Sequence, residues 1–262
     1  MDKVSIVMPN YNCGKFIKET IESVINQTYS NWEILFVDDC STDNSLEIAK
    51  SFNDERIKIF KNEKNSGAAF SRNKALREAS GKWIAFLDSD DIWAKDKLEK
   101  QVAFMKKNGY VFSYTQYNEI NSNSEEIGKY VTGPKSISKR RFFNYCWVGC
   151  LTVMYNRDIV GLIQINNAIA KRNDYALWLK VCKKAKCYLL PKILASYRRR
   201  EGSISHHKKT KLIKHHYRLF RIGEGNNPLL ALWRTFKNLF YGVIKKTFYV
   251  KKENLSEIKS GN

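Results

Sequence analysis

The apolar residues of the first 118 positions follow two alternating patterns. Short runs rich in β-branched and aromatic residues indicate strands, whereas apolar residues three or four positions apart indicate helices. Strands are expected at 3–8, 32–39, 57–62, 83–88 and 110–120, and helices at 14–27, 44–52, 67–80 and 95–107. This alternation, with short connections, predicts an α/β fold in which helices flank a mostly parallel sheet.

The second half of the chain shows a less regular pattern. Residues 121–150 are polar at first and contain glycine and proline, which predicts loops and one short helix. A strand at 151–155 is expected to rejoin the sheet, and an amphipathic helix is expected at 174–185. The segment 188–198 reads as extended, with an interruption at Pro191.

The segment 229–252 has an apolar stripe at helical spacing. The stripe consists of Leu229, Trp233, Phe236, Phe240 and Val243, and the basic residues lie largely outside it. Two interpretations fit this pattern. The helix packs on the rest of the domain, or it lies on a membrane surface with aromatic and basic residues facing anionic lipid. The sequence leaves both open.

The charge of the chain favours an anionic partner. The formal net charge is +20, and residues 198–262 contain 16 Lys and Arg against 4 Glu, so most of the excess lies in the last quarter. Nucleic acid, a phosphorylated substrate and an acidic membrane surface all suit this balance. No nucleic-acid-binding motif is recognisable, so we expect no nucleic-acid partner and keep a basic nucleic-acid-binding protein only as an alternative. The length of 262 residues suits one large domain, or one domain with an appendage.

The cysteines and the N-terminus favour a reducing compartment. None of the six cysteines forms a CxxC pair, and the first residues lack the charged and apolar regions of a secretory signal. No apolar run reaches the roughly 18 residues that span a bilayer. We therefore expect a cytoplasmic protein, peripheral on the inner face of the cytoplasmic membrane if the tail binds lipid. A zinc site formed by Cys146 and Cys150 is a remote alternative.

Carboxylates gather where the expected strands end. Asp38 and Asp39 follow the second strand, and Asp88 and Asp90 follow the fourth. In parallel α/β sheets, ligands bind outside the carboxyl ends of the strands, so these loops should meet at one edge. Two close carboxylates repel each other unless a cation compensates them, and Mg²⁺ commonly combines one or two carboxylates with substrate phosphate. The pattern therefore predicts a metal–phosphate site.

Five segments follow one another in an informative order: "VSIVMPNYN", "FVDDCSTDNS", "NSGAAFSRNKAL", "WIAFLDSDDIW" and "NDYALWLKV". In this combination the chain resembles the family-2 inverting glycosyltransferases of the GT-A fold, over about residues 3–205. The resemblance implies a GT-A domain at 1–205, with a nucleotide-sugar-binding half at 1–118 and an acceptor and base half at 119–205. Residues 206–262 would then form a basic, amphipathic helical tail.

The same resemblance implies which residues hold the donor. Asp90 would bind a divalent metal, Mn²⁺ or Mg²⁺, directly, and Asp88 would contact the ribose or reach the metal through water. Asp91 is expected to cap the following helix. The other donor contacts are implied at Pro9, Tyr11, Asn12, Asp39, Asn65, Gly67, Arg72, Arg198 and Arg200. His206 and His207 are alternative neighbours of the metal.

The catalytic base implied by the resemblance is Asp174, which would take the proton of the acceptor hydroxyl. Asn173 precedes it where the family usually has Glu, so the supporting role of that position is open. Trp178, one helical turn further on, is expected in the core rather than under an acceptor sugar.

These expectations define an activity. The chain would transfer a sugar, with inversion and with a metal, from a nucleotide diphosphate donor to an acceptor hydroxyl, and UDP is the favoured nucleotide. The acceptor would be a glycan or lipid-linked glycan of bacterial lipopolysaccharide, O-antigen or capsule biosynthesis. An inactive scaffold of the same fold on a membrane surface is the second alternative.

Overall fold

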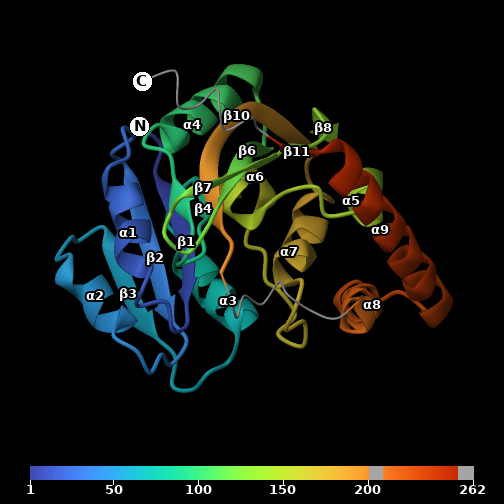
Figure 1. Ribbon diagram of the computed structural model, residues 1–262, viewed down its shortest axis with the longest axis horizontal. Helices are drawn as coiled ribbons and strands as arrows, with labels where there is room; N and C mark the ends of the chain where they lie inside the picture. The colour runs from blue at the N-terminus through green and yellow to red at the C-terminus, as the bar shows by residue number, and fades with distance from the viewer. Residues whose placement is uncertain (201–208, 253–262) are drawn as a thin grey trace.

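A parallel sheet forms the first half of the molecule. The structure, a computed structural model, describes residues 1–200 and 209–252. At its centre β1 (Val4–Asn10) pairs in parallel with β2 (Trp32–Asp38) and with β4 (Trp83–Phe86), and β3 (Ile57–Lys61) extends the ladder beyond β2. The order β3-β2-β1-β4 confirms the parallel sheet expected for this half (Figure 1).

The second half continues the sheet with mixed strand directions. Its strands are β5 (Ile92–Trp93), β6 (Phe112–Ile120), β7 (Glu126–Val131), β8 (Ser136–Ile137), β9 (Met154–Asn156), β10 (Cys187–Arg198) and β11 (Val250–Lys252). β9 lies antiparallel between β4 and β6, whereas β10 is parallel to β6. The sheet is therefore mostly parallel only in its first half, and the region expected to hold loops and one helix also contains β7 and β8.

The register of β10 explains its unusual sequence. Its pairing with β6 shifts between Leu190 and Ile193, and Pro191 lies inside this shift. Proline has no amide hydrogen to donate to a neighbouring strand, so it is tolerated where the ladder is interrupted. The extended segment expected here is thus confirmed, together with its interruption.

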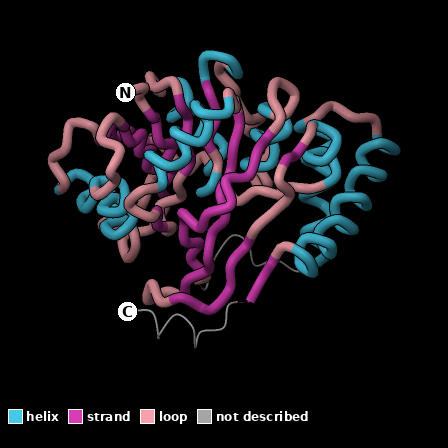
Figure 2. The backbone as a smooth tube through the Cα atoms, turned by 90° about the horizontal axis from the view of Figure 1, so that it is seen from above, coloured by secondary structure: helices cyan, strands magenta, loops and turns pink. Residues whose placement is uncertain are grey.

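Helices cover both faces of the sheet (Figure 2). Successive residues of a strand point to opposite faces, so apolar residues along a strand supply a core on each side. Val4, Ile6 and Met8 of β1 pack in one apolar cluster, while Val7 belongs to a second cluster on the other face. The described helices and helical turns are α1 (Ile17–Ile25), α2 (Ser45–Ser51), α3 (Ala68–Glu78), α4 (Lys97–Asn108), α5 (Lys139–Asn144), η1 (Cys150–Thr152), α6 (Arg157–Val160), α7 (Asn173–Val181), α8 (Lys209–Arg218), η2 (Leu219–Gly223) and α9 (Pro228–Phe248).

The C-terminal helices pack on the second half of the domain. Leu219, Phe220 and Ala231 are buried in the same apolar cluster as α7 and β6. The tail therefore packs on the domain, although its apolar stripe faces outward, as described below. Among the described residues, no helix is both long and apolar enough to cross a membrane. The expected boundary at 205 lies outside the described residues, as do His206 and His207.

Candidate active site

Three loops meet at the carboxyl edge of the parallel strands. The amide of Asp39 donates to the carbonyl of Asn10 at 2.8 Å, and the hydroxyl of Ser89 donates to the carbonyl of Pro9 at 3.2 Å. These contacts join segments 8–12, 37–43 and 87–91, which lie at the carboxyl ends of β1, β2 and β4. The convergence expected from a parallel sheet is therefore present, and it places Asp39, Asp88 and Asp90 in loops at the same edge of the sheet.

Asp39 organises the loop that leads into α3. Its carboxylate accepts hydrogen bonds from Asn62 Nδ2 at 2.8 Å, from the Ser66 amide at 2.9 Å and from the Gly67 amide at 2.7 Å. Gly67 has a φ of +86°, which other residues rarely adopt, so this close approach favours glycine. Asn65, at the loop surface, is exposed. A nucleobase contact of Asp39 remains a prediction.

The first loop forms the rim of the same edge. Asn12 accepts a hydrogen bond from the Thr42 amide at 2.8 Å through its side chain, which ties this loop to the one after β2. Tyr11 is 47% exposed, and Pro9 is half-buried. Asp38 is instead fully buried and holds Asn10 Nδ2 at 2.9 Å. Asp38 thus supports the loop, and Tyr11 is the side chain free to meet a ligand.

Arg72 connects the donor loops to the start of α7. One guanidinium nitrogen donates to Asp88 and another donates to Asn173 Oδ1, a residue 101 positions further along the chain. Burial alone would lower the pKa of Arg72, but the nearby charges of Asp88, Cys150 and Asp174 raise it overall. Arg72 therefore stays charged. Asn173, in place of the family's usual Glu, acts as a neutral acceptor for this arginine.

Asp90 lies at the centre of the acidic loop. Arg200 Nε donates to Asp90 Oδ2 at 2.6 Å, so one carboxylate oxygen is occupied. Burial raises the pKa of Asp90, Arg200 opposes this rise, and the charge of Asp88 adds to it. The position of Arg200, at the end of β10 and against the acidic loop, is compatible with its predicted contact to a diphosphate.

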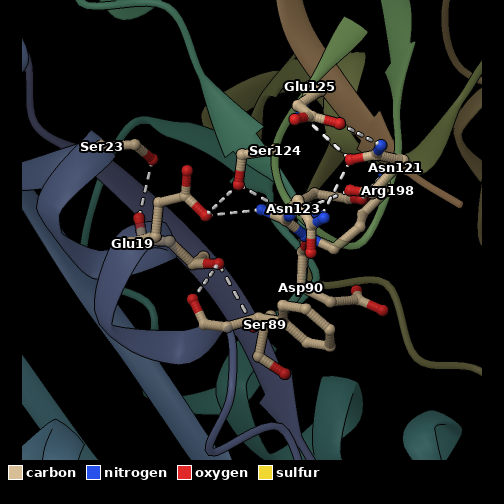
Figure 3. A network of polar contacts seen from close by, with 12 residues as sticks. Glu19, Ser23, Ser89, Asp90, Asn121, Asn123, Ser124, Glu125 and Arg198 are labelled. Carbon is tan, nitrogen blue, oxygen red and sulfur yellow. Dashed lines mark hydrogen bonds and ion pairs between the residues drawn. The ribbon is translucent and has the colours of Figure 1, made fainter. Parts of the chain in front are cut away.

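Arg198 has a different environment from Arg200. Its side chain is fully buried and donates to the carbonyl of Asp90 at 2.7 Å, to Ser124 Oγ at 2.9 Å and to Glu19 Oε2 at 2.7 Å (Figure 3). These partners take up its hydrogen-bonding groups inside the protein. Arg198 is better described as a positioning residue, and this packing does not support the predicted direct contact with the donor.

The expectation that Asp91 caps the following helix is wrong. Its Oδ1 accepts from the backbone amide of Arg198 at 2.9 Å, and α4 begins later, with Asp96 at its N-cap. Asp91 therefore links the acidic loop to β10 and does not cap the helix. Burial, with the charges of Asp90 and Asp88, raises the pKa of Asp91 well above its usual value.

Asp174, the predicted base, lies in the first turn of α7. No hydrogen bond or ion pair with another described residue occupies its half-buried carboxylate. Burial and then the charge of Asp174 raise the pKa of Cys146 to about 12, which places the carboxylate near that thiol as well as near Arg72. Trp178 is fully buried and its ring lies 4.8 Å from that of Phe86, which confirms it as core.

The acidic loop suits a divalent cation that a substrate helps to bind. Asp88 and Asp90 supply only oxygen donors, and burial leaves their mutual repulsion incompletely offset. Within residues 1–200 and 209–252, no group of three or more His, Cys, Asp or Glu side chains could hold a metal ion. Mg²⁺ typically uses one or two carboxylates with substrate phosphates, so the residues present fit such an ion.

Two cations near Asp174 were not selected from the sequence. Lys245 of α9 donates to the carbonyl of Cys146 at 3.5 Å. Burial lowers the pKa of Lys245 overall, with Arg172 adding to this effect and Cys146 and Asp174 opposing it. Arg172 precedes α7 in a left-handed conformation, with a φ of +61°. Lys245 comes close through the packing of α9 against the segment at 145–148, which no local pattern predicts, whereas Arg172 is a sequence neighbour of Asp174.

A parallel sheet with acidic loops at its carboxyl edge, continued by a mixed second half, is the arrangement of the GT-A fold. The chain belongs to glycosyl transferase family 2, whose family model matches residues 5–159. It is therefore a glycosyltransferase.

Similar proteins agree with this assignment. The chain is 41% identical over 233 residues to a putative teichuronic acid biosynthesis glycosyltransferase, TuaG, of Bacillus subtilis, which covers 88% of this chain and 92% of that protein. It is 40% identical over 250 residues to WfgD of Escherichia coli, a UDP-Glc:α-D-GlcNAc-diphosphoundecaprenol β-1,3-glucosyltransferase, covering 95% and 96% respectively. The S. aureus TarS structure in complex with UDP has the same fold, with a TM-score of 0.68, 22% identity, and coverage of 87% of this chain and 68% of that one.

Proposed function

We propose that the protein transfers a sugar from a UDP-sugar to a hydroxyl of a lipid-linked glycan, with inversion at the anomeric carbon. The observation that carries this proposal is the Arg72 bridge, which joins the acidic donor loop at Asp88 to the helix that begins with Asn173 and Asp174. This bridge would hold the donor loop and the base in a fixed relation to each other. The 40% identity to WfgD, which uses UDP-Glc and a diphosphoundecaprenol-linked acceptor, supports the choice of substrates.

The donor would lie along the carboxyl edge of β1, β2 and β4. Tyr11, whose ring is exposed, would contact the nucleoside. Asp39 is buried, but among the described residues its Oδ2 accepts only from the Gly67 amide, so this oxygen would accept a further hydrogen bond from an imide N–H. Arg200 would exchange its present partner, Asp90, for the diphosphate. That exchange keeps a positive charge next to the leaving group and frees Asp90.

Asp88 and Asp90 would hold the divalent cation. When bound, Mn²⁺ or Mg²⁺ offsets the negative charge that develops on the departing nucleotide diphosphate. Arg72 keeps Asp88 oriented from the other side, since its hydrogen bond fixes one carboxylate oxygen. The chain thus supplies the carboxylates and one positioning arginine, and the donor supplies phosphate oxygens.

Asp174 would act as the general base. As the acceptor oxygen attacks the anomeric carbon, its proton passes to Asp174 and the bond to the nucleotide diphosphate breaks on the opposite side of the sugar. Base catalysis of this kind contributes roughly 10²–10⁴-fold to a rate. The absence of a hydrogen-bond partner for Asp174 among the described residues leaves its carboxylate available for this proton.

Relatives support a role in the synthesis of a bacterial surface polysaccharide. TuaG is described as a putative teichuronic acid biosynthesis enzyme, and WfgD acts on a lipid-linked diphosphate sugar. We infer that the protein works in the cytoplasm, at the inner face of the membrane that holds the acceptor.

A donor panel tests the proposal. The purified protein is incubated with UDP-, GDP- and dTDP-sugars and a lipid-diphosphate-linked sugar acceptor, with Mn²⁺, with Mg²⁺ or with EDTA. We expect nucleotide release from a UDP-sugar only with metal, and a product whose anomeric configuration is opposite to that of the donor. Asp90→Asn should abolish release, whereas Asp96→Asn, another acid near the same loop, should not. Transfer in EDTA, or retention of configuration, would refute the metal-dependent inverting mechanism.

A further inference from the structure

The outer face of α9 carries an exposed aromatic stripe. Every exposed tryptophan and phenylalanine among the described residues lies on this helix, at Trp233, Phe236, Phe240 and Phe248. Leu229 and Val243 extend the stripe and are 80% and 65% exposed. A contiguous apolar surface of this kind marks an interaction site, because isolated apolar residues are common on protein surfaces but large patches are not.

The opposite face of α9 fixes the helix in this orientation. Ala231, Thr235 and Asn238 are buried against the domain, and Asn238 Nδ2 donates to the hydroxyl of Tyr175 at 2.8 Å. Turning the stripe inward would break this buried hydrogen bond and expose the residues that now pack. The stripe therefore faces outward as part of the packed structure. Figure 1 shows α9 at the edge of the molecule.

A basic groove runs beside the stripe, between α9 and α5. It has a volume of about 520 Å³ and is lined among others by Lys139, Arg140, Phe143, Trp233, Arg234 and Lys237. Among the residues that the structure describes, no carboxylate lines it. The Arg234 guanidinium lies 4.3 Å from the Phe143 ring centre, and the Lys237 ammonium lies 5.0 Å from the Trp233 ring.

We propose that α9 and α5 dock the enzyme on an anionic lipid bilayer, with the stripe in the interfacial region and the groove around a lipid phosphate head group. The occupant follows from charge and shape. Four cations beside exposed aromatic rings complement a surface that is apolar in depth and negative at the head groups. The helix has 21 residues but does not qualify as a membrane span, so it would lie in the plane of the bilayer.

The docked orientation would bring the base near the membrane. The face of α9 opposite the stripe carries Lys245, whose ammonium donates to the carbonyl of Cys146 at 3.5 Å. The charge of Asp174 partly opposes the lowering of the Lys245 pKa by burial. The helix thus stands between the bilayer and the acceptor side of the site. This consequence rests on the proposed lipid-linked acceptor, whereas the docking surface itself does not.

Vesicle co-sedimentation of the full chain tests the docking surface. Phosphatidylcholine vesicles are compared with vesicles that also contain phosphatidylglycerol. We expect binding to the anionic vesicles that weakens as salt is raised. Trp233→Ser combined with Phe236→Ser should weaken binding at least about tenfold, because each buried ring contributes apolar area. The control, Ile159→Ser combined with Leu162→Ser, removes equally exposed apolar residues elsewhere and should bind normally.

The charge contribution is tested separately. Lys139→Gln, Arg140→Gln and Lys237→Gln together should weaken binding to anionic vesicles by about 100-fold, at roughly fivefold for each cation, and should remove the preference over neutral vesicles. Lys18→Gln, Lys50→Gln and Lys107→Gln remove the same charge from exposed sites elsewhere and should have a much smaller effect.

Several outcomes would overturn the proposal. Equal binding of the wild-type and Trp233→Ser/Phe236→Ser proteins would show that the stripe does not contact lipid. A dimer in solution that these substitutions dissociate, without any vesicle binding, would make the face an interface between two copies. Failure of docking is distinguishable from failure of the proposed function, since the docking variants should still transfer sugar to a water-soluble acceptor.

Discussion

Replacing Arg72 should disturb stability and catalysis together, because this side chain bridges two parts of the site. Arg72 is 5% exposed, and its guanidinium donates to Asp88 on one side and to Asn173 on the other. Arg72→Met preserves most of the volume but removes both bonds and the charge. Asp88 would then keep a negative charge beside Asp90 with less compensation, and Asn173 would lose its buried donor.

The size of the effect follows from these contacts. A hydrogen bond to a charged group contributes roughly 1.5–3 kcal/mol, and leaving a buried acceptor without a partner costs roughly 1–3 kcal/mol. Asp88 is one-third exposed, so water recovers part of the loss on that side. We therefore expect the free energy of unfolding to fall by about 3 kcal/mol in Arg72→Met, and by about half of that in Arg72→Lys, which retains charge and one contact.

Urea unfolding and steady-state kinetics together test this reasoning. We expect kcat/KM for the donor to fall by at least about 100-fold in Arg72→Met, since misplacement of about 1 Å costs that much. In a double-mutant cycle with Asn173→Ala, the two residues should couple by about 1–2 kcal/mol. An unfolding free energy within about 0.5 kcal/mol of wild type, with unchanged kcat/KM, would refute the bridge.

Three further predictions concern buried groups and one glycine. Lys97 is fully buried and burial lowers its pKa to about 7, so the unfolded state holds a proton that the folded state loses. The unfolding free energy of the wild type should therefore rise by up to about 1.4 kcal/mol per pH unit above pH 7 relative to Lys97→Met, measured in urea from pH 7 to 9. Burial, with the charges of Arg172 and His215, lowers the pKa of His216 to about 3. The unfolding free energy should therefore fall between pH 6.5 and 3, and it should fall less steeply in His216→Leu. Identical dependence of the unfolding free energy on pH in the two proteins would contradict this. Gly67→Ala should cost about 1 kcal/mol and raise the donor KM, because its positive φ brings its amide to Asp39; an unchanged KM would argue against a role for this loop.

The parallel half of the fold was predictable because strand-like apolar runs alternate with segments of helical periodicity along the sequence. Strands such as β2 are apolar on both faces, and each helix between them shows its own period. Because the loops after β1, β2 and β4 must meet in such a sheet, it was also predictable that the loops that carry Asp39, Asp88 and Asp90 lie at one edge.

Long-range contacts were not predictable in this way. The bridge from Arg72 to Asn173 spans 101 positions and depends on how α3 meets α7. Nothing in the local sequence separates the buried Arg198 from the half-buried Arg200, since burial is set by β10 and its neighbours.

The tail illustrates the same limit. Its apolar stripe could have been expected to face the core, but the buried face of α9 consists of Ala231, Thr235 and Asn238. Small and polar residues pack there because α9 lies close to the domain, where Asn238 finds the buried Tyr175 hydroxyl. Amphipathic periodicity predicted the helix but not which side it buries.

The central claim is that a carboxylate at the start of α7 removes the acceptor proton while separate carboxylates hold the donor. Sugar transfer and UDP binding by Asp174→Asn test it most directly, with Asp158→Asn, another acid in a first helical turn, as the matched control. The account predicts that Asp174→Asn loses transfer by about 10²–10⁴-fold but binds UDP with metal as the wild type does, and that the control is fully active. Undiminished transfer by Asp174→Asn would contradict it.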